Sequence, residues 1–201
     1  MTPPAAERLL EFWFGPLDVK GLPELVRRRR WFQPPAGFDA ELRQRFGALV
    51  EAALAGSLDA WTLDPRGRLA LVLLLDQLTR NLFRDTPEAF AGDALALEHA
   101  LEAIDSGEAS GHAPVERTFL YMPLMHAEDL ALQDRCIELF ETLVASAEGS
   151  ARELFQGNLE FAKRHREPIA RFGRFPSRNV ALGRKSLPEE QAWLAAHPGG
   201  F

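Results

Sequence analysis

The chain contains 201 residues, 46% hydrophobic and 26% charged, which is typical of a globular protein with a sizeable core, and we expect a single domain over residues 1–201. Its formal net charge of −6 argues against a nucleic-acid-binding protein. One cysteine excludes an intramolecular disulfide, and neither a signal-peptide pattern nor a bilayer-length apolar stretch is present, so we expect a cytoplasmic protein without a membrane partner.

Helix-forming patterns and helix caps follow one another along the chain, and no strand or hairpin pattern interrupts them. The first helix is predicted at residues 3–14, where proline occupies the first turn and Gly15-Pro16 ends the apolar face. Residues 24–32 predict a short arginine-rich helix, and residues 38–54 predict a third helix with apolar side chains at helical spacing.

The central helix of the fold is predicted at residues 66–83, because Asp64-Pro65 caps its start and residues 69–75 are apolar on every side. Further helices are predicted at residues 93–104, 115–121, 128–147 and 151–172, and after a cap formed by Ser186, Pro188 and Glu189. We expect Pro123 to end or kink the helix before it, and Gly173 to be a left-handed cap. Because the connections are short, antiparallel helix pairs are expected, and the fold class is all-α.

The first polar cluster follows the apolar run of the central helix and consists of Asp76, Gln77, Arg80, Asn81 and Arg84. Spacing by four places Asp76, Arg80 and Arg84 on one helical face, and a carboxylate four residues before an arginine favours an ion pair. Two interpretations stay open. The cluster is either a buried polar seam that fixes helix register, or the lining of a ligand pocket.

The second polar cluster lies at residues 121–129 and contains Tyr121, His126, Glu128 and Asp129. Acidic residues in a first helical turn interact favourably with the helix dipole, which explains Glu128 and Asp129 without any function. Alternatively, His126 acts as a general base that Glu128 or Asp129 orients. One histidine with two acids lacks the ligand set of a metal site, so we expect no metal and no cofactor.

The third polar cluster lies in the basic C-terminal quarter and contains His165, Arg174, Arg178, Asn179 and Arg184. Eight basic residues and one acid occupy residues 163–185. These arginines can pair with the chain's own carboxylates, lock a loop by stacking on phenylalanine, or bind a carboxylate or phosphate ligand. The single cysteine, Cys136, lies among apolar residues, which predicts a buried and inert thiol.

Several segments together resemble the bacterial family known as domain of unknown function 924. They are residues 12–15 (FWFG), 31–32 (WF), 38–39 (FD), 73–84 (LLLDQ followed by RN and FR), 86–87 (TP), 121–129, the helix of His165, 172–179 (FGRFP followed by RN) and 182–184 (LGR). The resemblance implies a compact, tetratricopeptide-like right-handed array of helix pairs, and it implies no activity. Ala127 and Ser177 stand where the family often has Ser and His, which argues against catalysis at these two positions.

These clusters support three hypotheses about function. The first is a binding module in which an Arg- and His-lined groove takes an anionic small molecule or an acidic peptide. The second is an acid–base enzyme for a small anionic substrate, with His126 as the base. The third is a structural or protein-interaction module whose polar seams are internal. The oligomeric state is not predicted, and convergence of the three clusters is the observation that would favour the first hypothesis.

Overall fold

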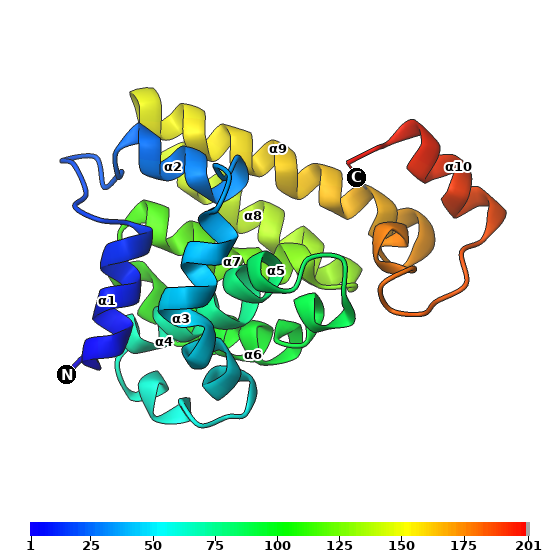
Figure 1. Cartoon of the computed structure of the whole chain (residues 1–201). Coiled ribbons are helices and arrows are strands. Elements are labelled where there is room, and N and C mark those ends of the chain that lie inside the picture. Colours follow the sequence, from blue (N-terminus) through cyan, green and yellow to red (C-terminus); the bar gives the residue numbers. More distant parts are fainter. Residues whose placement is uncertain (200–201) are drawn as a thin grey trace. The chain divides into compact units, whose positions relative to one another are not determined.

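The computed structural model describes residues 1–199, whose helices are drawn in Figure 1. The chain divides into two compact units: unit 1 contains residues 1–84 and 88–123, and unit 2 contains residues 85–87 and the chain from Leu124 onward. Within residues 1–199 every regular element is helical, apart from an isolated bridge between Leu17 and Pro23, which confirms the all-α prediction. No helix in this range is long and apolar enough to cross a membrane. A single domain over residues 1–201 stays a prediction.

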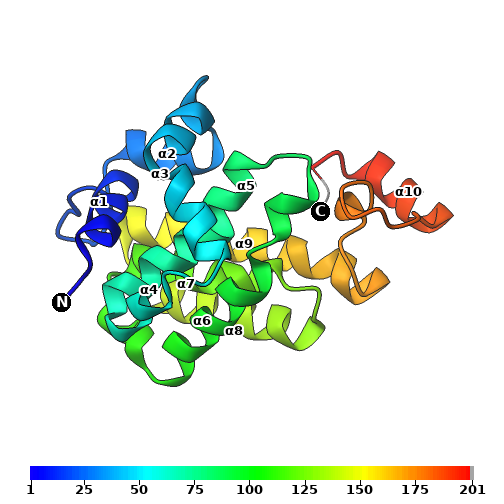
Figure 2. The same ribbon diagram turned by 60° about the horizontal axis from the view of Figure 1, so that its bottom comes forward.

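Unit 1 is organised around the central helix. This helix comprises α4 (Pro65–Val72), a π-helical stretch (Leu73–Leu78) and α5 (Thr79–Leu82). It packs against α1 (Pro4–Trp13), α3 (Phe38–Leu54) and α6 (Asp93–Asp105), as Figure 2 shows. Helix α2 (Leu25–Phe32) follows α1 along the chain. Helix α7 (Pro114–His126) begins in unit 1 and ends in unit 2. Residues 69–75 are almost completely buried, so the apolar run forms the core of unit 1 as predicted.

The start of the central helix is capped by Asp64, as its Asp-Pro sequence predicts. The Oδ1 atom of Asp64 accepts hydrogen bonds from the backbone amides of Arg66 and Gly67, both at 3.2 Å. The hydroxyl of Thr2 donates to the same oxygen at 2.8 Å, so the N-terminal residues are tied to the central helix. Two orphan amides of the first turn are thereby satisfied within unit 1.

The middle of the central helix differs from the uniform α-helix that its sequence predicts. Residues 73–78 widen into a π-helix, which leaves carbonyl groups in need of other donors. The hydroxyl of Thr79 donates to the carbonyl of Leu75 at 2.7 Å, and Arg80 Nη1 donates to the carbonyl of Asp76 at 2.8 Å. Gly92 packs so closely that an added Cβ would lie 2.2 Å from the Leu75 oxygen. The two hydrogen bonds lie within the helix, whereas the approach of Gly92 is a tertiary contact that helix propensity does not include.

The helix before Pro123 is longer than predicted. The sequence predicts a helix over residues 115–121 that Pro123 ends or kinks, whereas α7 continues through Pro123 to His126. A proline inside a helix removes one backbone hydrogen bond and strains the preceding turn. Here both Leu120 and Leu124 are completely buried beside it, and the burial of this apolar turn offsets the lost bond.

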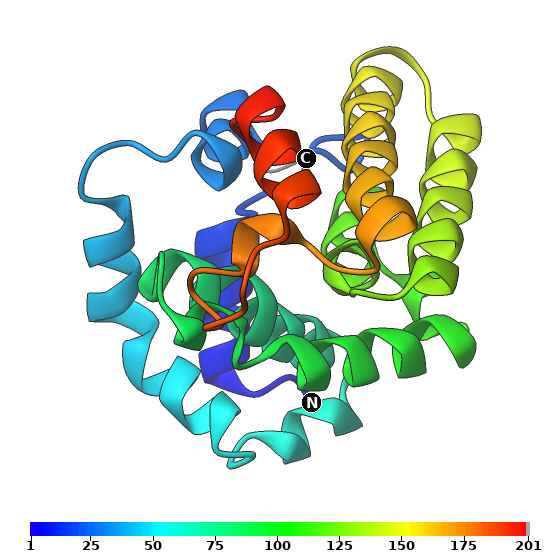
Figure 3. The ribbon, with the colours of Figure 1, turned by 90° about the vertical axis from the view of Figure 1, so that its right-hand side faces the viewer.

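Unit 2 is built on a helical hairpin. It contains α8 (Leu130–Ser146), α9 (Gly149–Phe172) and α10 (Pro188–Ala196), and Figure 3 shows α8 and α9 lying side by side and joined at one end. Asp129 is the N-cap of α8 and accepts from the Leu132 amide at 3.0 Å, so this helix begins after Glu128 rather than at it. Gly173 has φ 69° and ends α9, which confirms the predicted left-handed cap.

Candidate functional site

The first polar cluster contains a buried ion-pair network in unit 1. Asp76 is 1% exposed and lies 3.1 Å from Arg80, and Arg80 also contacts Asp93 of α6 at 2.8 Å. Burial opposes the charge of Arg80, but the two carboxylates outweigh it and raise the pKa of the guanidinium. The expected pair four residues apart is therefore present, and Asp93 is a partner that the sequence did not identify.

Arg84 and Asn81, at and beyond the end of the central helix, contact α3. Arg84 Nε donates to Asp39 Oδ2 and Asn81 Nδ2 donates to Asp39 Oδ1, both at 2.7 Å. Gln77 Nε2 donates to the carboxylate of Asp76 and to the sulfur of Met122. Because α5 ends at Leu82, Arg84 leaves the face that Asp76 and Arg80 share. Asp39 is a second partner that the local sequence pattern could not reveal.

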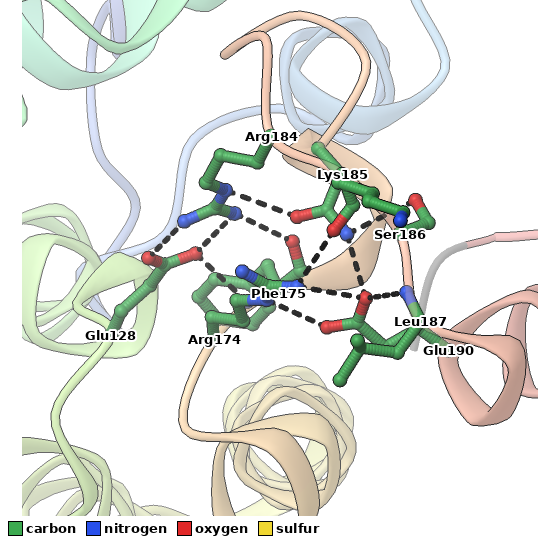
Figure 4. Close-up of polar contacts among 9 residues, drawn as sticks. Glu128, Arg174, Phe175, Arg184, Lys185, Ser186, Leu187 and Glu190 are labelled. Atoms are coloured by element: carbon green, nitrogen blue, oxygen red, sulfur yellow. Dashed lines mark hydrogen bonds and ion pairs between the residues drawn. The ribbon is translucent and has the colours of Figure 1, made fainter.

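Glu128 and Arg184 form a closed pair in unit 2 (Figure 4). The two guanidinium nitrogens of Arg184 lie 2.6 and 2.9 Å from the two carboxylate oxygens of Glu128, which also accepts from the Phe175 amide at 2.8 Å. Burial opposes ionisation of Glu128, but these hydrogen bonds outweigh it and hold the pKa of the carboxyl below its ordinary value. Glu128, sought as an orienter of His126, is thus bound to an arginine.

Glu190 is the centre of a second cluster of hydrogen bonds in the same loop region. Arg174 donates to its two oxygens at 2.6 and 3.0 Å, and the Asn179 side chain and the Leu187 amide donate at 3.0 and 2.8 Å. The Arg174 hydrogen bond is the main cause that lowers the pKa of Glu190 to about 2. Asn179 joins the Glu128 and Glu190 clusters, since its Nδ2 donates to Glu190 and its Oδ1 accepts from Arg184 Nε at 3.0 Å. The sequence predicted Glu189 as part of the α10 cap; the capping carboxylate is Glu190.

His126, His165 and Arg178 meet in unit 2 from three separate segments. The imidazole centroids of His126 and His165 lie 5.9 Å apart, and Arg178 Nη2 donates to the backbone carbonyl of His126 at 2.8 Å. The Phe175 ring contacts both His165 and Arg178. Its centroid lies 5.8 Å from that of the His165 ring, in an edge-on arrangement, and 4.4 Å from the Arg178 guanidinium. The second and third sequence clusters therefore converge here.

The remaining predicted residues have different positions. Asp129 is the N-cap of α8, and Tyr121 is buried on the unit 1 part of α7. Cys136 is buried as predicted, and burial raises the pKa of its thiol, which favours an unreactive thiol. Within residues 1–199 no group of three or more His, Cys, Asp or Glu side chains is arranged to hold a metal ion. The first polar cluster lies in unit 1, whereas the second, apart from Tyr121, and the third lie in unit 2.

Known proteins support a family assignment along nearly the whole chain. The family model described as a bacterial protein of unknown function (DUF924) matches residues 9–198. A solved structure of a protein of unknown function from Agrobacterium tumefaciens is 37% identical and covers 95% of this chain and 97% of its own, with a TM-score of 0.79. No curated protein matches the chain. The predicted family is confirmed, and the solved relative is similar in fold.

Proposed function

The chain belongs to the DUF924 family of bacterial proteins, and we propose that it binds a small anionic ligand, a carboxylate or a phosphate, at His126, His165 and Arg178. The observation that carries the proposal is the convergence of two imidazoles, 5.9 Å apart, with Arg178, whose guanidinium binds the backbone carbonyl of His126. The three residues come from α7, α9 and the short 3-10 helix that follows α9. Guanidinium groups fork onto carboxylate or phosphate oxygens, and a protonated imidazole adds a further donor.

The orientation of His165 supports this role. Its Nδ1 lies 2.8 Å from the carbonyl oxygen of Phe161, and because a carbonyl only accepts, Nδ1 carries the proton. The Nε2 atom is then the titrating position, and once protonated it donates to an anion. We therefore expect ligand binding to strengthen as the pH falls through the range in which imidazoles gain protons.

The other candidate arginines are better explained as structural groups. Arg80, Arg84, Arg174 and Arg184 each form an ion pair with a carboxylate of their own unit. A ligand that used any of them would have to displace an internal carboxylate, which leaves that carboxylate without its partner. We therefore assign the structural hypothesis to these four arginines, and the ligand proposal rests on the convergence of His126, His165 and Arg178.

The acid–base alternative has less support. It requires a carboxylate that orients His126, and Glu128 is held by Arg184 and the Phe175 amide while Asp129 caps α8. We therefore favour binding over catalysis. The tetratricopeptide-like right-handed array also stays a proposal: the α8–α9 hairpin is the kind of helix pair from which such an array is built.

Anion-dependent thermal stability tests the proposed site. Inorganic phosphate and citrate, compared with sodium chloride at equal ionic strength, should raise the melting temperature at pH 6 more than at pH 8, because a ligand that binds only the folded state stabilises it by about 2.7 kcal/mol at a hundredfold excess over Kd. Arg178→Gln and His126→Asn should abolish the shift.

A matched histidine provides the control. His197 also directs Nδ1 at a helical carbonyl, that of Trp193 at 2.9 Å, and His197→Gln should leave the anion shift intact. Absence of any shift with both anions, or equal shifts in the wild type and in Arg178→Gln, would remove the site.

A further inference from the structure

Helix α2 presents an outward face that the rest of unit 1 does not use. Leu25, Arg28, Arg29 and Phe32 are spaced i, i+3, i+4 and i+7, so they lie on one side of the helix. Leu25 and Phe32 are 53% and 55% exposed, and the neighbouring Val26 is 63% exposed. Scattered apolar side chains on a surface are ordinary, but Leu25 and Phe32 lie on one helical stripe together with two arginines.

The opposite side of α2 is anchored to unit 1. Trp31 is buried, and its ring centroid lies 4.8 Å from that of Phe119. Arg27 Nη1 and Arg30 Nη2 donate to the carbonyl oxygen of Phe12 at 3.0 and 3.2 Å. These two arginines therefore satisfy an orphan carbonyl at the end of α1, where positive charge also interacts favourably with the helix dipole.

The two outward arginines differ from those two. Among residues 1–199 neither Arg28 nor Arg29 forms an ion pair, and Arg28 Nε is shielded from water without a hydrogen-bond acceptor. The carboxylate influenced by Arg28 is that of Asp18, whose pKa is lowered mainly by its backbone hydrogen bond from Leu22 and least by Arg28. The face thus combines positive charge with exposed aliphatic and aromatic surface.

We propose that this α2 face docks an acidic amphipathic segment of a partner protein. Carboxylates of the segment would pair with Arg28 and Arg29, and its apolar side chains would cover Leu25 and Phe32. Arginine and aromatic residues are the types enriched in the centres of protein interfaces. The partner would bring the carboxylates that this face lacks.

Charge argues for this occupant over a second copy of the chain, because symmetric pairing through α2 would bring four guanidinium groups together. An anionic lipid surface also carries negative charge, and the vesicle measurement below distinguishes it from an acidic segment. The α2 face belongs to unit 1 and the proposed anion site to unit 2, so either proposal can fail alone.

Fluorescence anisotropy with three labelled peptides tests the docking face. The acidic probe carries leucines at i, i+3, i+4 and i+7 with glutamates between them; the second probe has lysine for each glutamate, and the third has serine for each leucine. The acidic leucine probe should bind the wild type, more weakly as salt rises, and the other two should not. Arg28→Glu with Arg29→Glu should weaken binding about tenfold or more.

A second double variant separates docking from net charge. Arg8→Glu with Arg152→Glu makes the same change in net charge at exposed positions outside α2, and it should leave probe binding unchanged. Melting temperatures close to the wild type in both double variants would verify folding. The Phe32→Ser variant should weaken binding of the acidic leucine probe as well, because the apolar contact is lost.

Several outcomes would overturn the proposal. One is failure of the acidic leucine probe to bind, and another is equal loss of binding in both double variants. Sedimentation of the wild type with phosphatidylserine vesicles, lost in Arg28→Glu with Arg29→Glu, would assign the face to lipid. A concentration-dependent dimer lost in the same variant would assign it to a second copy of the chain.

Discussion

The chain has two arginine-rich stretches, and the structure uses them in opposite ways. In unit 2 the loop arginines Arg174 and Arg184 close onto Glu190 and Glu128. In unit 1 the arginines of α2 divide, with Arg27 and Arg30 bound to a carbonyl and the other two on the outward face. The comparison teaches that a cluster of arginines does not by itself indicate a ligand, because tertiary structure decides which guanidinium groups are paired with the chain's own carboxylates.

The largest effect on stability is expected from Glu190→Ala, which removes the centre of the Glu190 hydrogen-bond cluster in unit 2. Arg174, Asn179 and the Leu187 amide would lose a common acceptor, so we expect a loss of about 3 kcal/mol in the free energy of unfolding. Urea unfolding followed by circular dichroism measures it. The control is Glu189→Ala, because Glu189 is the exposed neighbour in the same helical turn. Equal losses of stability in the two variants would contradict the role of Glu190 as the shared acceptor of this cluster.

Acid should weaken the same hydrogen-bond cluster. The pKa of Glu190 is lowered in the folded state from 4.5 to about 2, so its contribution to stability is complete above pH 4.5 and is lost as the pH falls towards 2. Glu190→Gln cannot titrate, and its melting temperature should therefore fall less than that of the wild type over this interval. An equal fall in the melting temperatures of the two proteins between pH 4.5 and pH 2 would argue against a lowered pKa of Glu190.

A smaller effect is expected from Arg184→Lys. Lysine keeps the charge but loses the fork that holds both oxygens of Glu128 and the carbonyl of Phe175, so stability should fall by about 1 kcal/mol. Lys185→Arg is the matched control, since residue 185 is exposed beside it. Thermal unfolding of the two variants measures the difference, and an unchanged Arg184→Lys protein would show that charge alone suffices.

The smallest effect is expected on the outward face of α2. Arg28→Ala and Arg29→Ala should each change the free energy of unfolding by about 0.5 kcal/mol or less, because neither side chain contributes an ion pair within residues 1–199. Arg30→Ala should cost about 1 kcal/mol, because it removes a donor to the Phe12 carbonyl. A larger loss of stability for Arg28→Ala than for Arg30→Ala would contradict the assignment of Arg30 to the anchored side of α2 and of Arg28 to the outward face.

Local sequence predicted the elements of the fold well. The Asp64 cap, the Gly173 cap and the buried run at residues 69–75 are as expected, because each depends on neighbours within one or two helical turns. The π-helical stretch and the continuation of α7 through Pro123 were not predicted. At the π-helical stretch Gly92 approaches Leu75 closely, a contact between distant residues that local sequence does not reveal.

The sequence indicated the polar residues of the candidate site, but not the partners that they have in the fold. The sequence indicated His126, His165 and Arg178, and the structure brings them together in unit 2. It did not indicate Asp39, Asp93 or Glu190, which neutralise three of the predicted arginines. These carboxylates are remote in sequence or sit in ordinary first-turn positions, where the helix dipole already explains them.

The sequence by itself determined that the chain is helical, where most helices begin and end, and which family it belongs to. Only the tertiary structure decided which arginines are neutralised and which face outward, since ion pairing depends on distances of a few ångströms between residues far apart in the chain. Helical periodicity places a side chain on a face. The folding of the rest of its unit determines what that face meets.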